Sequence, residues 1–311
     1  MVNAMAERFP YGGQAVMEGV MMRGLHRASV AVRSPAGQIV IRDRELNLER
    51  RVFWSRLPLL RGIQLLGDAL VIGMWALMFS ASVTDDQAEQ PLSKGQTALL
   101  VTTSVGISIA LFFVLPLLVA SGIANWANLG IYSRETIEGI TRLLIFVGYL
   151  VLVGRTAEIR RVFGYHGAEH KAVSAYEAGC PLTVEHVRPF TTIHPRCGTT
   201  LLLIVVVLSI PVFALLGTFP FWLRLLSRII LVPFVAALAY ELMRLTASKA
   251  TNPIVRGLMT PALALQRLTT REPDDAMLEV AIAALARVLA ADGQTVESQP
   301  IAVDIRPALT S

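Results

Sequence analysis

Four of the five histidines lie within residues 166–194, in two short clusters that could bind a metal ion. The first cluster has the order H-x-x-E-H, formed by His166, Glu169 and His170. If residues 155–176 are helical, the two imidazoles lie on one face, about one turn apart, where both can reach one zinc ion. The same order occurs in the inverted zinc-peptidase motif, where the carboxylate serves as the base. Glu169 is therefore the candidate general base.

A catalytic zinc ion needs a third protein ligand and an open coordination position. Glu241 is one candidate, because a carboxylate in such an apolar stretch is costly unless it has a partner. The second cluster supplies two others, His194 and Cys197, directly before another apolar stretch. If four His and Cys ligands closed around the ion, the site would be structural instead.

Other interpretations of these residues need no metal. His166 and His170 could be solvated imidazoles on a surface helix, and Cys197 a small buried residue at a helix start with His194 as a cap. Cys197 could also be a nucleophile, its thiolate favoured by a helix N-terminus and His194 or His170 acting as base. Glu18, among glycines and apolar residues, could face the same site or simply form a turn.

The composition is that of a membrane protein. Hydrophobic residues make up 54% of the 311 residues, charged residues only 16%, and the mean hydropathy is +0.56. Soluble domains carry about 25% charged residues. The low fraction of charged residues excludes a disordered chain and an ordinary soluble enzyme. The net charge of +5 comes without a basic-aromatic stripe, so we expect no nucleic-acid partner.

Four apolar stretches approach the length of about 20 residues that a membrane-spanning helix needs. They are residues 65–83, 97–123, 199–222 and 229–245. Residues 143–154 are apolar but short, which favours an interfacial or re-entrant helix. With the N-terminus inside, this arrangement leaves only Lys94, Arg224 and Arg228 outside, so the positive-inside rule predicts that both termini are cytoplasmic.

The predicted fold is mainly α-helical: a polytopic membrane protein with about four transmembrane helices, a small N-terminal β-hairpin region and a cytoplasmic loop and helix domain. The hairpin is expected over 29–33 and 38–42, and the glycines of residues 12–24 are expected to allow tight backbone turns and close approach. The amphipathic residues 274–291 should form a helix. The expected regions are 1–64 (cytoplasmic, with the hairpin), 65–123 (first transmembrane pair), 124–198 (interfacial or cytoplasmic, with the histidines), 199–245 (second pair) and 246–311 (cytoplasmic helical tail).

Three long strings and the tail resemble a known family. The strings are residues 12–23, 161–171 and 194–199, and the tail is residues 279–285. They are similar to the YqhQ-like family of bacterial membrane proteins, also called the DUF1385 family, and the resemblance spans most of the chain. The family is described as a predicted metal-dependent enzyme. The resemblance therefore supports a metal site and a bacterial cytoplasmic (inner) membrane location, without identifying the ligands.

These observations predict an integral membrane hydrolase that uses a divalent metal, zinc above all. His166, His170 and a third group would hold the ion, and Glu169 would act on its bound water. Beyond the surrounding membrane lipids, the expected partner is a membrane peptide or a lipid-linked substrate at the cytoplasmic face. The alternative is a non-enzymatic membrane scaffold or assembly factor with a structural metal site. A transporter is less favoured, because four spans without an inverted repeat are few for that task.

Overall fold

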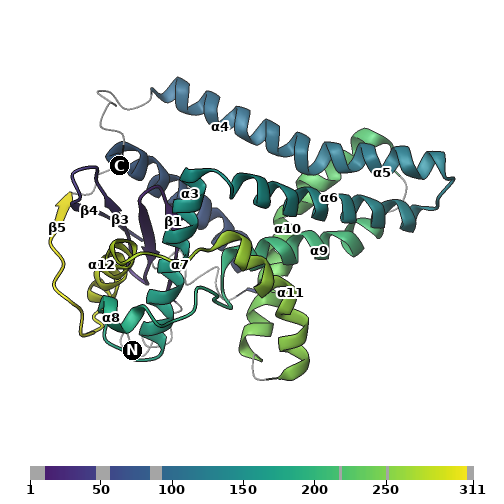
Figure 1. Ribbon diagram of the computed structural model, residues 1–311. Coiled ribbons are helices and arrows are strands. Elements are labelled where there is room, and N and C mark those ends of the chain that lie inside the picture. The colour runs from purple at the N-terminus through teal and green to yellow at the C-terminus, as the bar shows by residue number, and fades with distance from the viewer. Residues whose placement is uncertain (1–10, 47–56, 85–92, 217–218, 250–251, 307–311) are drawn as a thin grey trace.

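The structure is a computed structural model that describes residues 11–46, 57–84, 93–216, 219–249 and 252–306 (Figure 1). Within these residues a five-stranded sheet, flanked by helices, forms one end of the molecule, and long apolar helices extend away from it. The strands are β1 (Gly12–Val16), β2 (Gly19–Arg23), β3 (Arg27–Arg33), β4 (Ile39–Glu45) and β5 (Val303–Arg306). Their order is β1-β2-β3-β4-β5; the first four are antiparallel, and β5 pairs parallel to β4.

The hairpin expected near residues 29–42 is present as β3 and β4, and the glycine-rich residues 12–24, expected to allow tight turns and close approach, contain two further strands. Those residues form β1 and β2, joined by a two-residue turn at Met17 and Glu18. Glycine serves close packing here: a Cβ on Gly13 would lie 2.1 Å from the carbonyl oxygen of Met21. Only Glu18 in the turn has a positive φ, at +50°, a conformation that non-glycine residues seldom adopt.

Two helices cover one face of the sheet. α7 (Ala157–Glu177) begins after the cap Thr156, and α12 (Asp275–Ala291) begins after the cap Asp274, as the amphipathic pattern predicts. The apolar side of α12 is fully buried, through residues such as Leu278, Ile282 and Leu285, against β2 and β3 and against α7. A short helix, α8 (Val184–Val187), closes this core. The sheet, α7 and α12 therefore form one packed unit.

The other face of the sheet is covered by α3 (Leu60–Thr84). Ile72, Ala76 and Phe79 of this helix pack with strand residues that include Val30 and Val32. At its other end, α3 crosses α10, where Gly62 lies against the backbone of Ala237. α3 therefore links the sheet to the long apolar helices.

The remaining helices are apolar for most of their length. They are α4 (Lys94–Ile109), the π-helical turn η1 (Ala110–Val114), α5 (Leu115–Trp126), α6 (Ile131–Val153), α9 (Gly198–Ala214), α10 (Phe221–Ser248) and α11 (Pro253–Thr269). α4, η1 and α5 form one continuous rod. Among the described residues, four helices are long and apolar enough to cross a membrane: Leu60–Thr84, Gly95–Trp126, Ile131–Val153 and Phe221–Thr246, with mean hydropathy between 1.6 and 2.5. The chain is thus a multi-pass type of membrane protein.

One expected interfacial helix and one expected span differ from the structure. Residues 143–154 are not a short interfacial stretch; they complete the 23-residue helix α6, whose first half is more polar and was therefore missed. Residues 199–222 are not one helix, because α9 ends at Ala214 after 17 residues and α10 begins at Phe221.

Arg224 and Arg228 do not lie in an external loop, as the charge count assumed. Both are buried in α10, where their guanidinium groups donate to Glu135 and Glu138 of α6. Arg142 of α6 joins the network through Glu138. Buried charges are tolerated in an apolar bundle only when they are paired. This network connects α6 to α10.

Arg142 also reaches the neighbouring helices. Its guanidinium donates to the carbonyl oxygen of Phe112 in η1 and to the hydroxyl of Ser209 in α9. The same guanidinium lies 5.5 Å from the ring centre of Phe213. The two hairpins, α5–α6 and α9–α10, are therefore held together by polar contacts inside an apolar bundle.

We predict that Glu138→Gln destabilises the detergent-solubilised protein by about 3 kcal/mol, because Glu138 accepts from three buried guanidinium groups. Thermal unfolding followed by circular dichroism measures the loss. Glu158→Gln is the matched control, since Glu158 is exposed in the first turn of α7. If the two variants unfold at the same temperature, the network is not what holds the hairpins together.

Candidate metal centre

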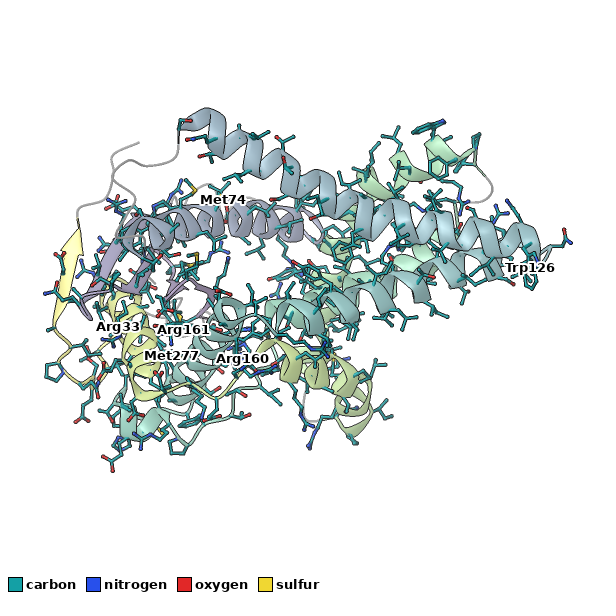
Figure 2. The ribbon with its side chains drawn as sticks, turned by 45° about the horizontal axis from the view of Figure 1, so that its top comes forward. Arg33, Met74, Trp126, Arg160, Arg161 and Met277 are labelled. Atoms are coloured by element: carbon teal, nitrogen blue, oxygen red, sulfur yellow. The ribbon has the colours of Figure 1, made fainter. Side chains whose placement is uncertain are left out.

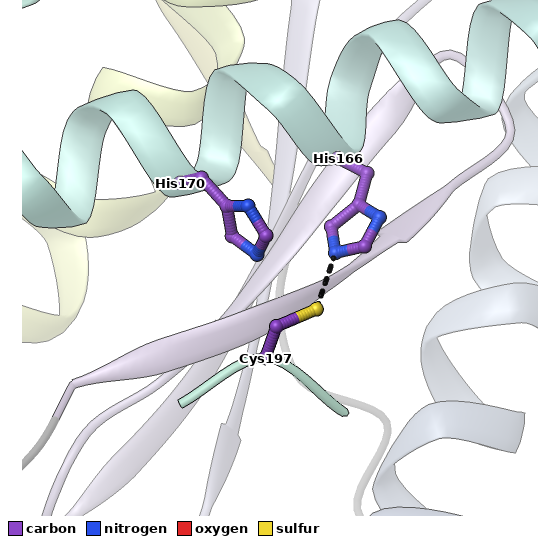
Figure 3. A group of neighbouring side chains, drawn as sticks. All are labelled: His166, His170 and Cys197. Atoms are coloured by element: carbon purple, nitrogen blue, oxygen red, sulfur yellow. Dashed lines mark hydrogen bonds between the residues drawn. The ribbon is translucent and has the colours of Figure 1, made fainter. Parts of the chain in front are cut away.

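Three side chains from two distant stretches of chain meet in one group: His166 and His170 of α7, and Cys197, which is the N-cap of α9 (Figure 3). One ligand atom from each lies within 4.8 Å of the others. The Sγ atom of Cys197 is 3.3 Å from Nε2 of His166. In a tetrahedral zinc site, the bond lengths imply ligand atoms about 3.3–3.6 Å apart. The donor set and its spacing therefore fit a zinc ion, with His170 needing a small inward movement.

Backbone carbonyl groups fix the orientation of both imidazoles. Nδ1 of His166 is 2.8 Å from the carbonyl oxygen of Thr269, and Nδ1 of His170 is 2.6 Å from that of Thr192. Because a carbonyl oxygen can only accept, each Nδ1 must carry the hydrogen. The lone pair of each neutral ring is then on Nε2, the atom that faces Cys197. Metal-binding histidines are oriented in this way by their outer hydrogen bonds.

Glu169 lies beside this group without being one of its three members. One carboxylate oxygen accepts the backbone N–H of Gly13 at 2.9 Å, and the other lies 3.5 Å from Nε2 of His170. The side chain is buried. A carboxylate held in this way, next to a ligand atom, is placed to hydrogen-bond a water bound to an ion at the centre.

Cys197 occupies the start of an apolar helix. As N-cap of α9 it lies at the helix end where backbone N–H groups have no partner within the helix. Its Sγ atom is 3.0 Å from the hydroxyl oxygen of Thr199 and 3.3 Å from Nε2 of His166. The sulfur of Cys197 is therefore positioned beside the first imidazole.

His194 lies close to the group but faces elsewhere. Its ring centre is 5.7 Å from that of His170, while its Nε2 is 3.4 Å from a carboxylate oxygen of Glu177. Burial lowers the pKa of His194 and keeps the ring neutral. The buried amide of Gln266 binds both backbone groups of His194. Gln266 was not recognised from the sequence, because a glutamine in an amphipathic helix carries no distinctive signal.

The structure does not bring Glu241 to this group. Its carboxylate pairs with the guanidinium of Arg61 in α3 and accepts the backbone N–H of Leu59. The partner that this carboxylate needs in an apolar helix is an arginine. Glu18 is also elsewhere: it pairs with Arg161 and accepts from the hydroxyl of Tyr165, at the hairpin turn of β1 and β2.

Close packing holds α7 against the chain that follows α11. A Cβ on Gly167 would lie 2.1 Å from the carbonyl oxygen of Arg271. The Nζ atom of Lys171 donates to the carbonyl oxygen of Arg188 and is paired with Glu272. These contacts bring the carbonyl group of Thr269 to His166, so the ligand geometry depends on the fit between α7 and residues 269–272.

The group is buried on most sides but not sealed. Cys197 and His170 are buried, whereas His166 is partly exposed, and Gly13 and Gly198 beside it are exposed. Two surface cavities lie elsewhere, one lined by His26 and Arg287 and one by Tyr176 and Cys180. The centre is therefore close to the surface on the side of His166, Gly13 and Gly198.

The fold and this group define a multi-pass helical membrane protein with a histidine and cysteine centre beside the membrane helices. The family described as "Protein of unknown function (DUF1385)" matches residues 57–291. The chain is also 33% identical, over 307 residues, to "Uncharacterized protein YqhQ" of Bacillus subtilis (strain 168); the alignment covers 93% of this chain and 95% of that protein. The chain belongs to the DUF1385 family. None of the solved structures matches it significantly.

We predict that Gly167→Ala destabilises the protein, although alanine normally stabilises a helix by about 1 kcal/mol relative to glycine. The added Cβ has no room beside Arg271, and that backbone must move. Gly148→Ala in α6 is the matched control, because nothing lies within 4 Å of its added Cβ. Thermal unfolding should shift downward for the first variant and stay level or rise for the second. Equal shifts of the unfolding temperature in both variants would contradict the close contact between Gly167 and the backbone of Arg271.

A further prediction concerns pH. Hydrogen bonds from Arg161 hold the pKa of Glu18 below its usual range. The ionised carboxylate therefore stabilises the fold above its unfolded pKa of about 4.3, and this contribution is lost as the pH falls through the lower folded pKa. Because the pair is partly exposed, Glu18→Gln should cost only about 1 kcal/mol at pH 7.

That difference should shrink progressively below about pH 4, where the wild-type carboxylate protonates. Unfolding curves of wild type and Glu18→Gln across this pH range measure it. Glu185→Gln, on the exposed surface of α8, is the control. A difference that is independent of pH would assign the effect of Glu18 to the shape of the turn instead of its charge.

Proposed function

We propose that this protein is a zinc-dependent membrane hydrolase whose ion is held by His166, His170 and Cys197. The observation that carries the proposal is the orientation of the two imidazoles: carbonyl groups bind both Nδ1 atoms, and both Nε2 atoms face one cysteine. Three protein ligands leave a fourth position of a tetrahedral ion open, which is the arrangement of catalytic zinc sites.

In this proposal the zinc ion would supply an activated water at neutral pH. Glu169 is the general base, because its carboxylate lies next to a ligand atom and is fixed by the amide of Gly13. His194 supports the site through Gln266 and is not a ligand. The substrate would be a membrane peptide or a lipid-linked molecule, because the centre lies at the start of an apolar helix.

We expect the purified full chain to contain about one zinc ion, measured by inductively coupled plasma mass spectrometry. His166→Ala and Cys197→Ala should each lose it, because either change removes one of three ligands. His186→Ala is the matched histidine control, since His186 is exposed in α8 and bonded to Thr183. Retention of zinc by all the variants would contradict the assigned ligand set.

The open position can be tested without knowing the substrate. In cobalt-substituted protein, the bound water should titrate near neutral pH and change the visible absorption spectrum. Glu169→Gln should keep the metal and shift this titration, because the carboxylate contacts the water. A spectrum that is independent of pH would contradict an open site.

The second candidate is a structural site in a membrane scaffold or assembly factor. It is favoured by the closeness of the His170 and His194 rings, since rotation of His194 could close the coordination shell. His194→Ala separates the two functions. It should lose the metal if the site is closed, and keep it in the hydrolase, where His194 is not a ligand.

A further inference from the structure

The packing of β1 against α7 restricts how the chain can cross a membrane. The amide of Gly13 donates to Glu169, the ring of Tyr11 packs edge-on against Tyr176, and Glu18 pairs with Arg161. These contacts place the sheet and α7 on the same side of the bilayer. The chain between them must therefore cross the membrane an even number of times.

Along the chain, three helical segments between β4 and α7 are long and apolar enough to cross a membrane: α3, the continuous α4–α5 and α6. Since three crossings would separate the sheet from α7, one of the three does not cross. The structure identifies which one, through the aromatic residues at one end of the bundle and the charged residues along α3.

The ends of α5 and α6 that point away from the sheet carry exposed aromatic side chains. Trp126 ends α5 and is 86% exposed, and Tyr132 begins α6 and is 73% exposed (Figure 2). Trp222, at the start of α10, is 77% exposed. Exposed Trp and Tyr gather where transmembrane helices reach the membrane–water interface. The hairpin of α5 and α6 therefore reaches the far interface, and both of its rods cross.

The middle of α3 carries one charged residue and contacts charged side chains of the sheet. Asp68 pairs with Arg23 of β2 at 2.7 Å. The guanidinium of Arg44 lies over the ring of Trp75, and that of Arg42 lies over the ring of Phe79. If α3 crossed, these groups would lie near the centre of the bilayer, where charged side chains are costly.

The side of α3 opposite the sheet is nonetheless apolar. Its residues are exposed and follow the helical repeat: Leu70, Val71, Met74, Leu77 and Met78. Met74 is labelled in Figure 2. A helix with one face on a folded domain and an exposed apolar strip on the other suits the surface layer of a membrane.

We propose that α3 does not cross the membrane and that its exposed apolar strip lies among the lipid chains of the leaflet nearest the sheet. The crossing rods are α4–α5, α6, α9 and α10. α9 must cross together with α10, because α12 packs on the sheet and α7 and so lies on their side. Its 17 residues are the lower limit for a span.

The charges of the loops between the crossing helices indicate on which side of the membrane the sheet lies. Residues 127–130 and 215–220, which join the crossing rods at the far end, contain no Lys or Arg. The connections on the side of the sheet contain many, so the positive-inside rule places the sheet and the metal centre in the cytoplasm. This inference does not depend on the metal or on catalysis.

The test uses the three lysines of the native chain, Lys94, Lys171 and Lys249. Right-side-out and inside-out vesicles, prepared from cells that express the full chain, are treated with a membrane-impermeant amine reagent. The labelled sites are then identified by mass spectrometry. Lys94, after α3, and Lys249, after α10, should both react only in inside-out vesicles. Lys171 is buried and ion-paired and should stay unlabelled while the protein is folded.

Two single variants complete the test. Ala127→Lys introduces an amine between α5 and α6, which should react only in right-side-out vesicles. Asp86→Lys adds a second amine between α3 and α4, in case Lys94 reacts poorly. If the amines before α4 react from the side opposite to Lys249, α3 crosses the membrane and the proposal is wrong. If they react from the side of Lys249, it is supported.

Discussion

The proposed metal centre depends on two hydrogen bonds, from Nδ1 of His166 and His170 to the carbonyl oxygens of Thr269 and Thr192. They fix the tautomer and the orientation of both rings, so that the free nitrogen of each ring faces the space beside the sulfur of Cys197. The acceptors come from different segments, one ending α11 and one preceding α9. The centre can therefore form only when α7, α11 and the start of α9 have assembled.

That assembly joins the two parts of the protein. α7 is packed on the sheet, and α9 and α11 belong to the apolar helices, so the centre lies where the unit of sheet, α7 and α12 meets the bundle. The network of arginines and glutamates between α6, α9 and α10 holds the same bundle together at a distance from the centre. A buried network of this kind favours one arrangement of the helices, because any other would leave charges unpaired in an apolar medium.

Much of the centre could be predicted from the sequence, because His166 and His170 follow the helical repeat and Cys197 begins an apolar helix. The carbonyl partners could not, since every residue has a carbonyl group and only the tertiary fold selects two of them. Glu241 was misassigned for a related reason: its apolar surroundings indicate a partner but do not say which. The strands over residues 12–24 were missed because glycine is typical of turns, whereas Gly13 and Gly19 lie within strands, close to the backbone of the neighbouring strand. The helix α6 was missed in part because Glu135, Glu138 and Arg142 make its sequence look polar, although the structure pairs and buries them.

X-ray absorption spectroscopy at the zinc edge, on the purified full chain, shows directly whether His166, His170 and Cys197 bind zinc. We expect a mixed first shell with one sulfur at about 2.3 Å and nitrogen or oxygen atoms at about 2.0–2.1 Å. In Cys197→Ser the sulfur contribution should disappear. A first shell of oxygen and nitrogen only in the wild type, or a protein that binds no zinc, would contradict it.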